Sequence, residues 1–113
     1  MLTPKDRQNH FIREFMRGGQ KYVMQDELSA VRPEKLRLFN VLTLIPGASI
    51  GYHVHEGEGE MMYFIEGNGR VRDDDAWHDV GPGDTLATLS GHGHSVENTG
   101  DTDLVILAAI VSD

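Results

Sequence analysis

The sequence has no cysteine among its 113 residues. Disulfide bonds, thiolate metal sites and cysteine nucleophiles are therefore excluded, and any metal ion must be bound by histidine, aspartate or glutamate. Basic residues are also scarce, because 10 Lys and Arg stand against 18 Asp and Glu, for a formal charge of −8. This charge disfavours nucleic acid or an anionic membrane surface as a partner.

Long apolar runs are missing as well. Residues 1–11 lack the apolar stretch of a secretory signal peptide, and no segment approaches the roughly 18 apolar residues that span a membrane. We therefore expect a soluble, cytoplasmic protein. No repeat, linker or low-complexity tract divides the chain. Its length suits a single domain whose hydrophobic core is large enough to be stable without disulfide bonds.

The first residues have the pattern of a short N-terminal helix. Thr3 suits the N-cap, Pro4 the first helical position, and Gly18-Gly19 the end. Apolar residues four apart give this segment one apolar face: Phe11 with Phe15, and Ile12 with Met16. That face could lie on the domain's own surface or on a partner subunit, and the pattern leaves both open.

Short strand-like segments and turns follow each other along the rest of the chain. The strongest strand signals lie at residues 36–45, 60–66 and 104–111, and Asp73–Asp75 is expected to form an exposed hairpin tip. Turns at roughly every 8 to 12 residues are typical of an antiparallel sandwich or barrel. We divide the chain into an N-terminal helix and arm, residues 1–35, and a barrel, residues 36–113, within one domain.

The candidate chemistry begins in the segment 47–67. His53 and His55 are one residue apart, so in a strand both imidazoles point to the same face and can share one metal ion. The glycine-rich residues 56–59 predict a tight turn that brings Glu60 back to face them. A borderline divalent cation accepts this mixture of imidazole and carboxylate.

His94 is a further ligand candidate. It starts a strand in which His94, Val96 and Asn98 share a face that can point into the same interior. Three imidazoles and one carboxylate fill four positions of an octahedron and leave two for water, dioxygen or a chelating substrate. Such a donor set suits one divalent transition metal per chain and accepts Mn, Fe, Co, Ni, Cu and Zn alike.

These residues form two motifs that resemble those of the cupin superfamily. The first, G-x5-H-x-H-x4-E-x6-G, is matched at Gly47, His53, His55, Glu60 and Gly67. The second, G-x5-P-x-G-x2-H-x3-N, is matched at Gly83, Gly91, His94 and Asn98, with Leu89 in place of the proline. The resemblance implies an all-β double-stranded β-helix, also called a jelly roll or cupin barrel, with metal ligands His53, His55, Glu60 and His94. It also implies a homodimer.

Other residues are candidates for roles around this site. His92 repeats the His-x-His spacing with His94, which makes it a candidate catalytic acid–base group, or else a solvated histidine in a glycine-flanked loop. Met62 and Phe64 share the strand face of Glu60, and with Asn98 they are candidates for a substrate pocket. The two apolar residues suit the core equally well.

Two classes of function stay open. The first is a metal-dependent enzyme of the dioxygenase or decarboxylase type, acting on a small oxygenated molecule at the open metal positions. The second is a non-catalytic module that binds or senses a small ligand or sugar. Isomerases and epimerases also occur in the family that the motifs resemble, because one fold hosts many functions.

Overall fold

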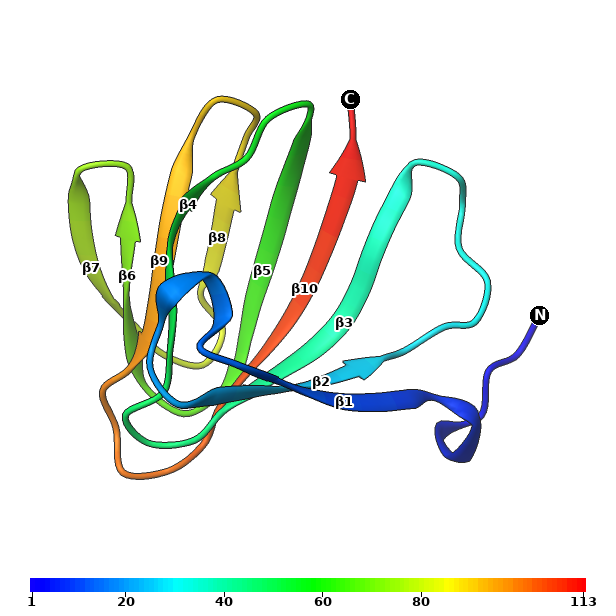
Figure 1. Cartoon of the computed structure of the whole chain (residues 1–113), viewed down its shortest axis with the longest axis horizontal. Helices are drawn as coiled ribbons and strands as arrows, with labels where there is room; N and C mark the ends of the chain where they lie inside the picture. The colour runs from blue at the N-terminus through cyan, green and yellow to red at the C-terminus, as the bar shows by residue number, and fades with distance from the viewer.

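Two antiparallel sheets form the molecule in a computed structural model that describes residues 1–113 (Figure 1). In spatial order, the larger sheet contains β1 (Asn9–Glu14), β2 (Tyr22–Glu27), β3 (Leu36–Leu44), β10 (Leu104–Ser112), β5 (Glu58–Glu66) and β8 (Thr85–Thr88). The smaller contains β4 (Ser49–Val54), β9 (Gly93–Asn98), β6 (Gly69–Asp73) and β7 (Ala76–Val80). The expected all-β jelly roll is confirmed. No helix in the chain has the length and apolar character needed to cross a bilayer.

The core lies between the facing sides of the two sheets. Strand β5 shows the alternation that places it there, because Glu60, Met62 and Phe64 are buried while Met61 and Tyr63 between them are exposed. Phe64 belongs to a cluster of 13 buried apolar residues that fills the space between the layers. The face of this strand that carries Glu60, Met62 and Phe64 therefore points into the barrel, as its sequence predicts.

The expected N-terminal helix is wrong. After Pro4 there is only one 3-10 turn, η1 (Lys5–Arg7), and the chain then extends as β1 and pairs with β2. Ladder hydrogen bonds to β2 satisfy the backbone that a helix would otherwise satisfy internally, so strand pairing overrides the i,i+4 pattern. Phe15 and Arg17 have positive φ values of 48° and 56°, which end any regular element at this point.

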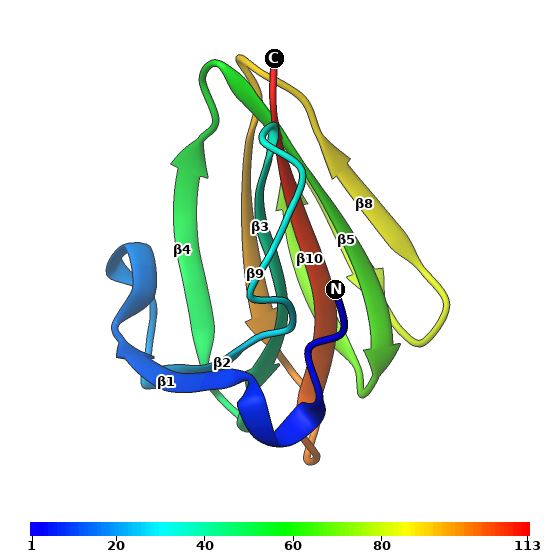
Figure 2. The same ribbon diagram turned by 90° about the vertical axis from the view of Figure 1, so that its right-hand side faces the viewer.

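The connection between β1 and β2 leaves the larger sheet and reaches the edge of the smaller one. It contains a second 3-10 turn, η2 (Met16–Gly18), which lies beside β4 (Figure 2). The Ser49 amide donates to the Gln20 carbonyl at 3.1 Å. A Cβ atom on Gly51 would collide with the carbonyl of Arg17, so the close backbone approach requires glycine there. This loop therefore covers the otherwise free edge of β4.

Candidate metal centre

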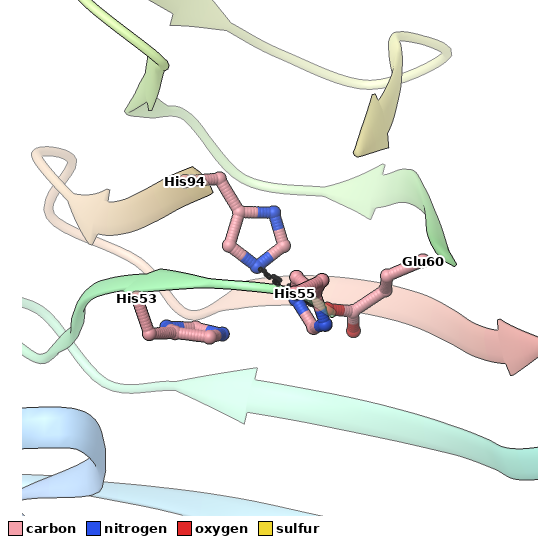
Figure 3. Close-up of side chains that lie close together, drawn as sticks. All are labelled: His53, His55, Glu60 and His94. Atoms are coloured by element: carbon pink, nitrogen blue, oxygen red, sulfur yellow. Dashed lines mark hydrogen bonds and ion pairs between the residues drawn. The ribbon is translucent and has the colours of Figure 1, made fainter. Parts of the chain in front are cut away.

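Four side chains from three strands of the barrel converge between the sheets (Figure 3). His53 lies on β4, His55 follows the end of that strand, Glu60 lies on β5 and His94 on β9. One ligand atom from each lies within 4.8 Å of every other. His53 is half-buried, and the other three are buried, with His94 at 0% exposure.

Strand register explains why these positions meet. His53 pairs directly with His94 between β4 and β9, beyond an irregularity that separates this pair from Ile50 and its partner. Glu60 pairs with Thr88 on β8, which places its carboxylate above the same interior. Ile50 is buried, and regular alternation would place His53, three residues later, on the opposite face. The irregularity between these two residues shifts the alternation, so His53 and, two residues on, His55 both point inward.

Hydrogen bonds orient two of the imidazoles. Nδ1 of His53 donates to the Gly51 carbonyl at 2.8 Å, and because a carbonyl can only accept, Nε2 of this ring carries a free lone pair. Nδ1 of His94 lies 2.7 Å from the Thr88 hydroxyl, and its Nε2 faces the cluster. A protonated Nδ1 held by a second group is the usual state of an imidazole that binds metal through Nε2.

Electrostatics favours neutral imidazoles here. Burial lowers the pKa of His53 to about 4, opposed by its hydrogen bond to Gly51 and assisted by the charges of His94 and Arg17. Burial is also the main cause of a lowered pKa at His55, where the Glu60 carboxylate acts in the opposite direction. The rings of His53 and His55 are therefore ready to bind a cation at neutral pH without first losing a proton.

The carboxylate of Glu60 completes a donor set that fits a metal ion. Oε1 lies 3.1 Å from Nε2 of His55 and 3.2 Å from Nε2 of His94, and no Lys or Arg forms an ion pair with it. A buried carboxylate with only imidazole partners lacks a compensating charge, which is costly. One divalent cation, held by three nitrogens and one oxygen, would supply that charge, and the residues present fit such an ion.

The remaining candidates from the sequence lie away from this cluster. Nδ1 of His92 is 2.6 Å from Oδ2 of Asp74, in an exposed pair outside the barrel. This pairing raises the pKa of His92. Met62 and Phe64 are buried in the apolar core. Asn98 is buried four residues further along β9, and its side chain bonds to backbone carbonyls there.

Thr88 and Arg17 act on the cluster, although the sequence pattern did not single them out. Thr88 supports His94, but its role depends on the pairing of β8 with β5, which no local pattern reveals. Arg17 is exposed on η2, and its charge contributes to the lowered pKa values of both His53 and His55. Arg17 reaches this position because η2 packs against the edge of β4, and these two segments lie far apart in the sequence.

Comparison with known proteins agrees with this arrangement. The family model of the cupin domain matches residues 40–110. An oxalate-binding protein from Thermotoga maritima is 43% identical over 98 residues, which cover 85% of this chain and 81% of that protein. The crystal structure of a predicted oxalate decarboxylase from Thermotoga maritima is similar over the whole of both chains, with 38% identity and a TM-score of 0.91.

A more distant structure has a different activity in its description. It is a sugar phosphate isomerase of the cupin superfamily from Silicibacter pomeroyi, 25% identical, with a TM-score of 0.69. The match covers 80% of this chain and 60% of that one. The barrel is thus shared with proteins described as acting on quite different molecules.

Proposed function

The chain belongs to the cupin family, and on that premise we propose that its three histidines and Glu60 bind one divalent transition metal, through which the protein binds a small oxygenated acid of the oxalate class. The observation that carries the proposal is the convergence of four ligand atoms within 4.8 Å around a buried carboxylate without a Lys or Arg partner. The relatives described as oxalate-binding and as a predicted oxalate decarboxylase support the choice of ligand.

A bound metal would act as a Lewis acid that accepts two oxygens of a chelating acid at its open positions. The protein contributes the rest of the site. Gly51 and Thr88 hold two imidazoles in orientation, and Met62 and Phe64, which share the inward face of β5 with Glu60, belong to the apolar core further along the barrel. Arg17 adds a positive charge near His53, which favours an anionic ligand in an otherwise acidic protein.

Binding and catalysis are separate proposals for this site. Decarboxylation of oxalate needs a proton donor for the formate product, and the one acid–base candidate from the sequence, His92, bonds to Asp74 outside the barrel. This arrangement favours binding as the first function to test. Decarboxylase and dioxygenase activities stay predictions, to be checked by formate production and by substrate-dependent oxygen uptake.

The decisive experiment measures metal and ligand in the same preparations. Elemental analysis of untagged protein should find close to one transition metal per chain, and a His53→Ala/His94→Ala double variant should lose it. Calorimetric titration should then show oxalate binding to the metal-loaded wild type and none to the metal-free protein. Absence of metal after reloading and dialysis would overturn the proposal, as would oxalate binding that is independent of metal.

We further propose that the protein is a homodimer. Strand β1 is an edge strand whose six residues are all exposed, and Ile12 within it and Phe15 just after it expose 59% and 63% of their surface. An exposed apolar edge strand calls for a partner, and a second copy provides one. Sedimentation analysis should show a dimer that Ile12→Glu weakens and the exposed control Val31→Glu does not. A monomer in the wild type at about 100 µM would contradict this proposal.

A further inference from the structure

The tip of the β6–β7 hairpin makes three hydrogen bonds to the segment just before His94. Asp74 sits at this tip with a φ of 49°, a left-handed conformation that Asp tolerates better than most residues. Its Oδ1 accepts from the Gly93 amide at 2.9 Å, and its own amide donates to the Gly93 carbonyl at 2.9 Å. Its Oδ2 lies 2.6 Å from Nδ1 of His92. One residue thus bonds the two positions that lead into a candidate metal ligand.

The same segment also bonds to a second ligand. The His55 amide donates to the carbonyl of His92 at 3.0 Å, and the Gly91 amide donates to the carbonyl of His55 at 2.7 Å. Residues 91–93 therefore lie between His55 on one side and Asp74 on the other. A shift of this segment would change the separation of His55 from His94, which is the spacing that a shared metal ion requires.

The hairpin tip is itself held in place. Nε of Arg72 donates to the Asp74 carbonyl at 2.7 Å, and its guanidinium stacks over Tyr52 with 4.1 Å to the ring centroid. The Tyr52 hydroxyl lies where a side chain on Gly93 would lie, so glycine is required for this close packing. Asp74 is thus one end of a connected support that includes the strand carrying His53.

Regular strand pairing does not replace these bonds. The ladder between β6 and β9 has Asp73 paired with His94 at its end. The contacts of Asp74 lie beyond that pair, at Gly93, the first residue of β9, and at His92 just before it. On its other side Gly93 pairs with Val54 of β4. Without the Asp74 side chain, the β6 side of this segment keeps the last ladder pair and the bond from the Asp74 amide to the Gly93 carbonyl, and neither of these bonds holds His92.

We propose that Asp74 is a positioning residue for the metal centre, which fixes the 91–93 segment and through it the spacing of His55 and His94. On this view His92 links Asp74 to His55, because its ring bonds to the Asp74 carboxylate and its carbonyl accepts from the His55 amide. The inference rests on the proposed metal function, and it assigns a role to a half-exposed residue that forms no hydrogen bond or ion pair with the side chains of the four candidate ligands. A carboxylate suits the role because its two oxygens accept from the Gly93 amide and the His92 ring at once.

The test compares metal binding in Asp74→Ala, Asp74→Asn and Asp75→Ala. Asp75 is the adjacent, fully exposed carboxylate, and its one ion pair, to Arg72 at 3.7 Å, is of the weak solvent-exposed kind. Its variant therefore changes the charge equally and keeps every hydrogen bond of Asp74. Dissociation constants for Co2+ are measured by competition with a chromophoric chelator, and the visible absorption of bound Co2+ reports the coordination geometry. Groups that orient metal ligands typically change affinity about 10- to 100-fold. Because Asp74 acts through the backbone, we expect about 10-fold weaker binding and altered bands in Asp74→Ala.

Asp74→Asn keeps one oxygen for the Gly93 amide, so we expect an intermediate affinity, and this variant serves if Asp74→Ala does not fold. Asp75→Ala should match the wild type in affinity and spectrum. Wild-type protein that binds no metal would overturn the proposed function, and this inference with it. Wild-type protein that binds metal, with Asp74 variants within twofold of Asp75→Ala and unchanged spectra, would overturn this inference alone.

Discussion

Replacement of Asn98 by Ala separates a structural role from a role in the substrate pocket. The Asn98 side chain is 4% exposed, and its Nδ2 donates to the Leu44 carbonyl at 2.8 Å and to the Thr102 carbonyl at 2.9 Å. Its Oδ1 accepts from the Gly100 amide at 2.9 Å. Each bond contributes about 1 kcal/mol, and unpaired buried partners add to the cost. We expect Asn98→Ala to lower the free energy of unfolding by about 3 kcal/mol.

The metal centre should not be affected by this change. Asn98 lies four residues from His94, or about 13 Å along the strand. Urea denaturation of the metal-free protein measures the loss, which corresponds to a melting temperature lower by about 10 °C. The exposed Asn68→Ala is the control and should change stability by less than about 0.5 kcal/mol. Full stability of Asn98→Ala combined with lost oxalate affinity would refute this reasoning and place Asn98 in the substrate pocket.

Three further predictions concern the metal centre. Glu60→Gln should reduce metal affinity at least 100-fold yet raise the stability of the metal-free protein by about 1 kcal/mol, because it removes a buried charge without a cationic partner; lower urea stability of that variant would contradict this. The metal-free protein should lose stability as the pH falls from 6.5 towards about 4, since the unfolded chain binds a proton at His53 that the folded chain, with its lowered pKa, does not. The full difference is worth about 3 kcal/mol, and solvent screening of this half-exposed ring reduces it to about 1–2 kcal/mol, which urea denaturation at pH 7 and pH 4.5 would reveal. Arg17→Gln should weaken oxalate binding by about 3- to 10-fold in calorimetric titration and leave metal content unchanged, whereas the same change at exposed Arg13 on β1 should change neither oxalate affinity nor metal content.

The spacing of the histidines and the glutamate predicted the candidate site. Side chains alternate along every strand, so His53 and His55 share a face wherever that strand is placed, provided that it is a strand. The turn after them returned Glu60 towards the same interior, and His94 came from the second motif. For the same reason the inward positions Met62 and Phe64 could be predicted, since period-two alternation is local.

The N-terminal segment shows where local patterns fail. Residues 11–16 carry apolar side chains at helical spacing, yet the chain forms strand β1 up to Glu14 because β2 offers a ladder of hydrogen bonds. Both arrangements satisfy the backbone, and the choice between them depends on a neighbour that becomes adjacent only in the folded chain. The division of the chain at residue 35 stays a prediction, although β2, which precedes it, pairs with β3.

The sequence by itself determined the type of fold, the four candidate ligands and the absence of thiolate chemistry, because these depend on residue identity and on the period of a strand. Only the tertiary structure decided what surrounds them. Strand pairings and loop contacts between distant parts of the chain bring the Thr88 hydroxyl beside His94, the Asp74 carboxylate beside His92 and the Arg17 charge near His53. Register between strands is set by packing of the whole barrel, so no local pattern contains it.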